Sequence, residues 1–529
     1  MKKYFLLVLL FLFILPLYSQ SKYQITDVNY TIKGCGPKIM GQTKAYALEN
    51  YEAVDKEIVF NSEDELKEYI KDYELRLNNL RNFETIVISY SYKLDENSNP
   101  DSIIPVTLNV QLKDSIHILG LPYPKYNSNE GFTLKLKIKD TNFMGTINEM
   151  NASFDLKLEQ ESEEQPIKPN FGFTFSYDYP FKVKKVNFKW INDYSFFYKV
   201  GNWSPEWNAK TGIEIKYKQK NINYVLDLYQ SVNRDFDYSE YNDLTYFGEE
   251  VKFSLPIDIF EIKNVSTLQY TPYVDFVFNF DKNKININNS SLSSPYLTVG
   301  HSLAIKRVNW NRNLRDGINF EVGNYYKYNF QRKMFYTNFN LSLNVYKSFP
   351  LFNTDNFMNR FGLAGRIYAF IDIYDYTNIY FQNDGSKIGG YLRGARDYQK
   401  FAASEVSDWY SLQTPAAFCF SFDIPLHIFE THFSNKTFFR YFNFDLQISP
   451  FIDFAVFYNK YTKSWFDLKD GVYTGGIEVL VYPAKWSSFT VRGSLGLDLS
   501  RTLLKKIVNT DWRENCALYE IDFGIGLKY

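Results

Sequence analysis

The last eleven residues of this chain alternate between apolar and polar side chains without interruption. A backbone places every second side chain on one side only when it is extended, because the side-chain period of a β-strand is two residues. The apolar set is Tyr519, Ile521, Phe523, Ile525, Leu527 and Tyr529, and the polar set is Glu520, Asp522, Gly524, Gly526 and Lys528. This pattern predicts a strand with one lipid-facing side that ends on an aromatic residue, as in an outer-membrane β-barrel.

The N-terminal residues have the features of a secretory signal. Lys2 and Lys3 precede a continuous apolar run from Tyr4 to Leu15, and small polar residues follow near Ser19. The run is too short to span a bilayer comfortably, and no stop-transfer pattern follows it. We therefore predict that residues 1–20 are a signal peptide, with a retained N-terminal anchor as the alternative.

The composition fits a membrane barrel better than a helical membrane protein. Mean hydropathy is −0.34, and no second apolar stretch approaches the length of a membrane-spanning helix. Aromatic residues make up 19% of the chain, with 44 Tyr and 48 Phe, and barrels use such residues in girdles at both interfaces. The formal net charge of −1 gives no overall field that would attract nucleic acid.

The sequence contains no recognisable catalytic, cofactor-binding or metal-binding constellation. Cys35, Cys419 and Cys516 are too scattered for a disulfide framework or a Cys-x-x-Cys pair. His427 and His432 lie five residues apart, and a turn between two strands explains them more simply than a metal site does. We predict a protein that is not an enzyme and needs no cofactor or metal.

Residues 21–114 are predicted to form a small α+β domain. Ser62 and Glu65 form a capping box, and apolar residues then recur at three- and four-residue spacing, which predicts a helix over 63–80. A weaker helix is expected at 45–54, and strands are expected near 25–32, 86–92 and 106–112. This order and size resemble a POTRA domain, the periplasmic module of the BamA/TamA outer-membrane assembly family. A plug or an unrelated α+β cap is the alternative.

Residues 115–529 are predicted to form an antiparallel transmembrane β-barrel, because alternating segments and polar loops follow one another throughout. Between Phe132 and Lys139, for example, apolar residues alternate with Thr and Lys, and such polar rows suit a wet lumen. A soluble sandwich would also alternate, but its polar faces would point outward. About 25 residues per strand and connector gives about sixteen strands, whereas counting the segments gives about eighteen.

The first barrel strand is predicted to be short, from about Ser115 to Leu121. Pro122 and Pro124 follow, and each lacks the backbone donor that a continuous ladder requires.

Three motifs inside the barrel region resemble motifs of the BamA/TamA family. The stretch from Asp140 to Thr146 looks like the family's early periplasmic turn, through Asp140, Asn142, Phe143 and Gly145. The Arg393-Gly394 pair is similar to the motif at the tip of the family's long sixth extracellular loop, which folds back into the lumen. The segment around Asp453 resembles the strand motif whose carboxylate faces that loop, and about five strands' worth of sequence follows Arg393.

This chain departs from the family pattern in three respects. Ala395 stands where the family prefers Phe or Tyr, and Ala455 stands where it prefers Gly. A single POTRA-like unit is visible, where the main bacterial assembly factor usually has five. The departures leave open whether a general assembly factor or a specialised paralogue is implied.

The pairing of Arg393 with Asp453 can also be argued from chemistry. A guanidinium inside a barrel loses part of its hydration and is stable there only if it finds a carboxylate or several acceptors, and its planar fork suits a bidentate carboxylate. Such a pair would lock the loop in the lumen. The alternative is a solvated Arg393 in a mobile loop, with Arg396 and Asp397 pairing locally.

The resemblance implies a non-enzymatic factor of the bacterial outer membrane that inserts or translocates proteins, with its N-terminal domain in the periplasm. Its partners would be unfolded client proteins, the lipid bilayer and periplasmic chaperones or accessory lipoproteins. Clients would add a strand to the free edge of the small sheet and to a seam between the first and last barrel strands. The alternatives are a two-partner-secretion-type exporter and a passive diffusion porin, which would conduct steadily without a client and would not need residues 23–114. An adhesin or structural barrel has only long polar stretches in its favour.

Overall fold

The computed structural model describes most of the chain from residue 22 onward. The described residues are 22–35, 41–92, 103–127, 131–159, 168–200, 205–236, 238, 242–262, 266–282, 287, 292–350, 360–374, 386–395, 398–400, 409–433, 442–486, 488–513 and 517–526. The predicted signal peptide, Arg396, Asp397, Cys516, Leu527 and Tyr529 lie outside them. No helix among the described residues is long and apolar enough to cross a membrane.

The N-terminal residues form a four-stranded sheet with two helices. The strands are β1 (Lys22–Lys33), β2 (Val59–Phe60), β3 (Phe83–Tyr92) and β4 (Ile103–Asp114), in the spatial order β2-β1-β4-β3. Helix α2 spans Ala45–Tyr51, and α3 spans Glu63–Asn79, which confirms the helix predicted over 63–80. The backbone N–H of Glu65 donates to Ser62 Oγ at 3.2 Å, as a capping box requires. Leu66, Ile70, Tyr73 and Leu77 of α3 are buried against the sheet.

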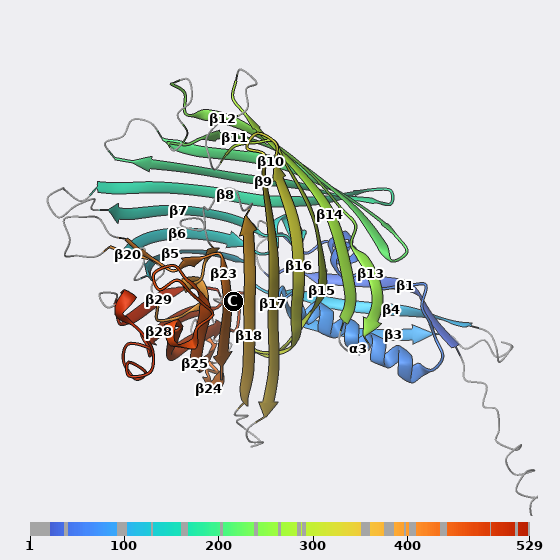
Figure 1. Cartoon of the computed structure of the whole chain (residues 1–529). Coiled ribbons are helices and arrows are strands. Elements are labelled where there is room, and N and C mark those ends of the chain that lie inside the picture. The colour runs from blue at the N-terminus through green and yellow to red at the C-terminus, as the bar shows by residue number, and fades with distance from the viewer. Residues whose placement is uncertain are drawn as a thin grey trace, which may run out of the picture.

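The rest of the chain forms one large antiparallel sheet (Figure 1). Its strands are β5 (Ile118–Asn127), β6 (Gly131–Asp140), β7 (Met150–Glu159), β8 (Lys168–Val183), β9 (Val186–Lys199), β10 (Glu206–Gln219), β11 (Ile222–Arg234), β12 (Thr245–Ser254), β13 (Ile257–Ile262), β14 (Ser266–Phe280), β15 (Tyr296–Asn311), β16 (Leu314–Asn329), β17 (Met334–Pro350), β18 (Arg360–Tyr374), β23 (Ala416–Asp423), β24 (Leu426–Glu430), β25 (Phe444–Asn459), β26 (Ser464–Trp465), β27 (Val472–Pro483), β28 (Val491–Asp498) and β29 (Tyr519–Ile525). The order returns to its start because β29 pairs with β5, so the sheet is a barrel.

The barrel has more strand positions than the sixteen estimated from length. Three of its segments share a position with a neighbour, because β12 and β13 both pair with β14, β23 and β24 both pair with β25, and β26 and β27 both pair with β25. Eighteen positions remain, which agrees with the segment count. The length estimate was wrong because several connections are tight turns, such as the two-residue turn between β8 and β9.

The first barrel strand differs from its prediction. It begins at Ile118 rather than Ser115 and continues through Pro122 and Pro124 to Asn127, so the predicted end at Leu121 was wrong. The register with β6 is continuous along β5, whereas β29 pairs only with its last two residues. Prolines two residues apart lack donors on the same side of a strand, and here that side faces the poorly paired edge, where a missing donor interrupts no ladder.

The barrel strands have alternating faces. Leu134, Leu136 and Ile138 of β6 are 42%, 43% and 39% exposed, while Lys135 on the other face pairs with Asp155 at 2.6 Å. In β29, Tyr519, Ile521 and Phe523 are exposed and Glu520 and Asp522 are buried, which confirms the alternation predicted for these residues. The apolar sides of the strands therefore form the outer wall.

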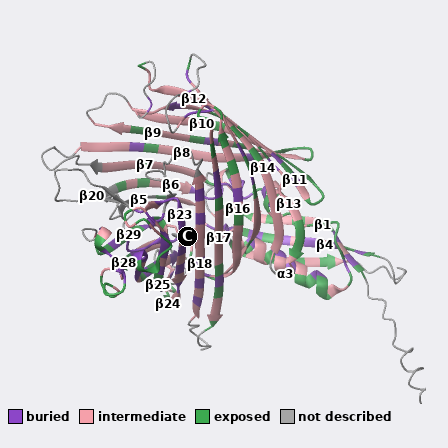
Figure 2. Ribbon diagram, in the orientation of Figure 1, coloured by how far each residue is buried: buried purple, intermediate pink, exposed green. Residues whose placement is uncertain are grey.

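Burial is uneven around the barrel. Figure 2 shows buried residues concentrated in the N-terminal domain and in the strands near the C-terminus, while the strands from β6 to β16 are mostly half-buried or exposed. The connection between β18 and β23 causes this difference, since it contributes Ile388, Leu392 and Ala395 to a buried cluster inside the C-terminal strands. Its short elements are β19 (Ser386–Lys387), η3 (Gly389–Tyr391), β20 (Tyr398–Lys400), β21 (Trp409–Ser411) and β22 (Gln413–Thr414).

This connection is the seventh at the barrel end away from the N-terminal domain, where the family resemblance implied the sixth. Thirteen strand positions precede it and five follow it, so the five strands expected after Arg393 are present. The loop is the seventh rather than the sixth connection because the additional strands of the barrel precede it in the sequence.

Candidate functional site

The barrel closes through a short contact. β29 and β5 share two residue pairs, Asp522 with Asn127 and Phe523 with Tyr126, whereas β28 and β29 share seven. Continuing the same register would place Pro124 opposite Ile525, and Pro124 has no N–H to donate. Among the described residues, the contact thus lies at the end of β5 far from the N-terminal domain, and the ladder stops where the prolines begin.

An apolar cavity of about 500 Å³ lies beside the unpaired part of this seam. Leu119 of β5 and Ile525 of β29 both line it, together with Phe442, Asn443, Phe444, Val481, Pro483, Trp486, Phe489 and Val491. The two seam strands therefore border an apolar space on the side toward the N-terminal domain.

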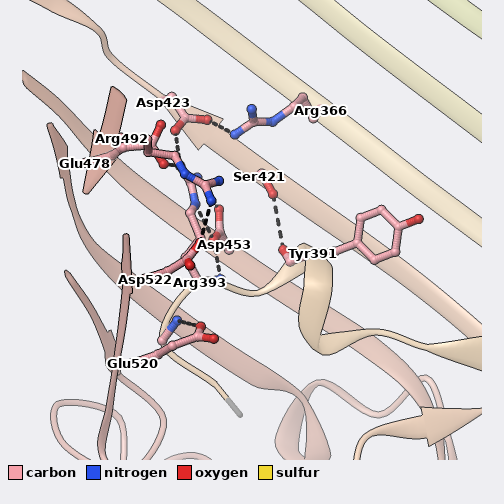
Figure 3. Close-up of polar contacts among 11 residues, drawn as sticks. Arg366, Tyr391, Arg393, Ser421, Asp423, Asp453, Glu478, Arg492, Glu520 and Asp522 are labelled. Atoms are coloured by element: carbon pink, nitrogen blue, oxygen red, sulfur yellow. Dashed lines mark hydrogen bonds and ion pairs between the residues drawn. The ribbon is translucent and has the colours of Figure 1, made fainter. Parts of the chain in front are cut away.

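Arg393 lies at the centre of a buried polar cluster inside the C-terminal strands (Figure 3). Its Nε and Nη2 donate to Asp453 Oδ2 and Oδ1 at 3.0 and 2.7 Å, and its backbone N–H donates to Asp453 Oδ2 at 2.9 Å. Arg393 is 1% exposed and Asp453 is 0% exposed. The Arg393 guanidinium also lies over the Phe451 ring, with 3.7 Å between Cζ and the ring centroid. The structure thus brings together the arginine and the carboxylate that the sequence singled out, in a bidentate arrangement.

Two further carboxylates, which the sequence did not identify, face the same guanidinium. Arg393 Nη1 donates to Asp423 Oδ1 at 2.5 Å and lies 3.8 Å from Glu478 Oε2. Asp423 also pairs with Arg366 of β18 through its other oxygen. Asp423 ends the inward-facing row of β23, so the alternation of that strand could have placed it in the lumen, but the partner on a distant loop has no local signal.

Gly394 connects the loop to the last strand of the barrel. Its backbone N–H donates to Glu520 Oε2 on β29 at 3.0 Å. Its φ of +104° is a conformation that favours glycine, and a Cβ there would lie 2.7 Å from the Gly496 carbonyl carbon and from the Leu497 nitrogen of β28. The loop tip therefore touches the backbone of β28 and holds β29, which is one of the two seam strands.

The two alanines that depart from the family pattern lie where the loop packs most closely. Ala395 is 2% exposed, Ala455 is 0% exposed, and both belong to the same buried apolar cluster. Tyr391 stacks on Tyr368 of β18, with 4.2 Å between ring centroids. The loop is thus held by apolar packing as well as by Arg393.

The turn between β6 and β7 joins the barrel to the N-terminal domain. Asn142 Nδ2 donates to Thr43 Oγ1 at 2.7 Å, and Thr43 donates from Oγ1 and N to the two oxygens of Asp114 at 2.7 and 2.9 Å. Asp140 accepts from the Asn142 backbone N–H at 2.9 Å. Burial raises the pKa of Asp114 above its ordinary value, and the hydrogen bonds from Thr43 oppose that rise.

The remaining residues of the turn motif shape its backbone. Phe143 and Gly145 bound the short 3-10 helix η2 (Phe143–Gly145), and Gly145 has a φ of +74°. A Cβ on Gly145 would lie 2.0 Å from the Gln42 carbonyl oxygen, while the Gly145 oxygen accepts from Lys44 N at 2.9 Å. Asn142 and Gly145 therefore contact the segment that enters α2, and Asp140 positions Asn142, which the sequence alone did not show.

The N-terminal domain also contacts turns elsewhere on the barrel. Asn79 at the end of α3 bonds Asn309 at 2.9 Å, and the Arg81 guanidinium lies over the Trp310 ring at 4.0 Å. Ser488, between β27 and β28, donates to the Arg81 oxygen at 2.7 Å. The contacted segments are the end of β15 and the connection between β27 and β28, which lie far apart in the strand order. The domain is therefore docked across this end of the barrel.

His427 and His432 line a cavity of about 430 Å³ at the same end of the barrel. His427 lies in β24 rather than in a turn, and its Nε2 is 3.1 Å from Asp445 Oδ1. No group of three or more His, Cys, Asp or Glu residues that could hold a metal ion occurs in the described part of the chain.

No family model matches the chain, and no curated protein matches it. Among solved structures it is similar to BamA from Haemophilus ducreyi lacking POTRA domains 1–3, with 12% identity, a TM-score of 0.36 and coverage of 94% of this chain and 84% of that chain. It is also similar to CdiB from Acinetobacter baumannii, with 11% identity, a TM-score of 0.44 and coverage of 96% and 74%, and to CdiB from Escherichia coli, with 9%, 0.43, 94% and 76%. BamA, whose family the motifs resemble, is thus among the proteins this chain is similar to. At these TM-scores the similarity is loose, and the proposals that follow rest on the chain's own geometry.

Replacing Arg393 with Ala should destabilise the barrel by about 3 kcal/mol, because the buried Asp453 loses its bidentate partner and Asp423 keeps only Arg366. The measurement is the temperature at which the folded, fast-migrating band is lost on a denaturing gel. Arg332→Ala, at an exposed arginine in the β16–β17 turn, is the control and should leave that temperature unchanged. An unchanged value for Arg393→Ala would show that the buried pair does not hold the barrel.

Replacing Gly394 with Ala should release the loop tip, since the new Cβ meets β28 backbone and the φ of +104° is strained by about 1–3 kcal/mol for any other residue. Protease cleavage within residues 386–395 in intact cells reports the release. Gly390→Ala is the matched control, because a Cβ at Gly390 meets nothing within 4 Å. Equal cleavage of the two variants would contradict the close approach.

Replacing Thr43 with Val should loosen the domain from the barrel turn. Asp114 and Asn142 would each lose a buried hydrogen-bond partner, at a cost of about 1–3 kcal/mol per group. Limited proteolysis of the connection between Asp114 and Ile118 should become faster. Thr26→Val, at an exposed threonine of β1, should not change the rate.

Proposed function

We propose that this chain is a non-enzymatic factor of the bacterial outer membrane that inserts or translocates client proteins through its seam. The observation that carries the proposal is the contact between β29 and β5, which has two residue pairs among the described residues where the neighbouring ladder has seven. Backbone groups must be paired in lipid, so a poorly paired edge is unstable there unless another strand pairs with it. An incoming client strand supplies those partners.

The proline pair makes the first strand a suitable receiving edge. Pro122 and Pro124 offer β29 no backbone donor at two positions of β5 beyond the paired residues, while the ladder from β5 to β6 is intact. The apolar cavity beside the seam can hold the lipid-facing side chains of an entering strand. Opening the seam therefore requires the loss of few backbone hydrogen bonds.

The Arg393 loop limits the movement of the other seam strand. Gly394 holds Glu520, and Arg492 of β28 donates to Asp522 of β29 at 2.6 Å. These contacts attach β29 to the rigid C-terminal strands, so we assign the movement to β5 and its neighbours. Arg393, Gly394 and Asp453 are in this proposal a lock that fixes one side of the gate.

The N-terminal domain, which we propose to be a POTRA-like periplasmic domain, offers a second receiving edge. β3 is at the edge of its sheet, and a cavity of about 320 Å³ lies between this strand and α3, lined by Lys71, Glu74, Leu75, Asn78, Phe83, Glu84 and Ile86. An extended client segment could add to β3 and place side chains in this cavity. The domain is docked on the barrel, so a client held there is delivered near the seam.

The test joins the seam strands covalently. Tyr126→Cys with Phe523→Cys bridges the paired residues, and we expect the oxidised double variant to lose client insertion and to regain it on reduction. Leu495→Cys with Ile521→Cys bridges β28 and β29 and should not affect insertion. Insertion is measured as the yield of a folded client barrel in membranes that contain the variant. Full activity with the seam closed would exclude the seam as the route and would favour export through the lumen or passive diffusion.

A further inference from the structure

One row of polar side chains lies on the outer, otherwise apolar wall of the barrel. Thr211 of β10, Gln230 of β11 and Glu249 of β12 are directly paired across adjacent strands, and all three are exposed. Their chain neighbours Lys210 and Glu250 face the other side of the sheet and form an ion pair at 3.0 Å. We call these three residues the polar row.

The polar row lies between apolar rows on both sides. The next outward residues toward the far end of the barrel are Ala209, Val232 and Phe247, and those toward the N-terminal domain are Ile213, Leu228 and Val251. Leu228 and Val251 are exposed, as lipid-facing residues are. The row is thus within the apolar band of the wall, where lipid tails offer no hydrogen-bonding groups.

The polar groups at one end of the row are satisfied by the wall itself. Thr211 Oγ1 accepts from Trp190 Nε1 and donates to Asn192 Oδ1, both at 3.0 Å. Another outward polar residue, Asn324 of β16, donates to Thr337 Oγ1 at 3.3 Å and to the Asn338 oxygen at 3.0 Å. These side chains need no external partner.

Gln230 and Glu249 differ from them. Neither side chain makes a hydrogen bond or an ion pair with any residue that the structure describes. An ionisable side chain directed into the membrane without a partner is costly and indicates an interaction site. The partner must therefore bring polar groups into the apolar layer, which a protein does and a lipid tail does not.

We propose that this face of β10–β12 is an interface with a second copy of the chain. The proposal rests on the proposed function, because it requires the barrel to cross a membrane. Both copies insert in the same direction, so the two-fold axis that relates them lies along the membrane normal. Each residue near this axis then lies opposite the same residue of the other copy. A glutamine amide has both a donor and an acceptor and can pair with itself, so Gln230, the middle residue of the row, lies near the axis.

The surroundings of Gln230 suit this arrangement. Rotation about this axis interchanges the two ends of the polar row. Thr211 of one copy therefore faces Glu249 of the other copy. Ala209 and Val232 directly beside the row are small and let two walls approach closely. β10–β12 are several positions away from β5 and β29 in the strand order, so the seam of each copy stays open to lipid.

The experiment uses full-length protein in native membranes with Cys35, Cys419 and Cys516 changed to Ser. Gln230→Cys and a short bismaleimide should give a product of twice the chain mass, linked between the two copies of position 230, because facing walls are about 10 Å apart. Val322→Cys, an outward position on β16, is the control and should give no such product. Adding Glu249→Leu to Gln230→Cys should reduce the linked fraction several-fold.

Each other outcome overturns the proposal. Linkage of position 230 to a different protein would assign this face to another membrane partner. Absence of linkage, with position 230 fully labelled by a monofunctional maleimide, would show that lipid covers it. If the chain is not found in the membrane fraction in its heat-modifiable form, the proposed function itself fails, and that result is recorded separately from the linkage.

Discussion

The structure depends on the pairing of backbone hydrogen bonds around a ring of strands. Every strand of a barrel in lipid must pair on both sides, because an unpaired N–H or C=O group costs several kcal/mol there. Among the described residues, continuous ladders join neighbouring strands of the ring except between β29 and β5, which share two residue pairs. Pro122 and Pro124 lie on β5 beyond these pairs and have no backbone N–H to extend the contact toward the N-terminal domain.

The two sides of the wall next to that contact differ in how many buried residues they contain. The C-terminal strands enclose the Arg393 guanidinium among the buried carboxylates of Asp423, Asp453 and Glu478, and Arg366 also pairs with Asp423. A guanidinium removed from water is stable only with such partners, so the loop that carries it cannot leave without exposing several unpaired carboxylates. The strands from β6 to β16 contain few buried residues in the part of the chain that the structure describes (Figure 2). Movement at the seam is thus expected on the side of β5.

The N-terminal domain is attached to the barrel at several points. Asn142, Thr43 and Asp114 form a chain of buried hydrogen bonds between the β6–β7 turn and the small sheet, and Asn79 at the end of α3 bonds Asn309 near the end of β15. Because the β6–β7 turn directly follows the first two barrel strands, the domain is attached to the barrel close in sequence to the seam strand β5. This coupling gives the turn motif a structural role that its spacing alone did not reveal.

The sequence determined the fold class, the helix over 63–80, the alternation of the last strand and the identity of Arg393 and Asp453 as candidate partners. The fold class, the helix and the alternation follow from local period and local capping chemistry, which can be read from neighbouring residues. Arg393 and Asp453 were singled out by the resemblance of their two motifs, and the desolvation of a charged group gave the reason for pairing them. Tertiary structure decided the number of strands, the true extent of β5, and the presence of Asp423, Glu478 and Glu520 around the loop tip. Those features depend on which strands become neighbours, and register between residues far apart in sequence is set by closure of the whole sheet.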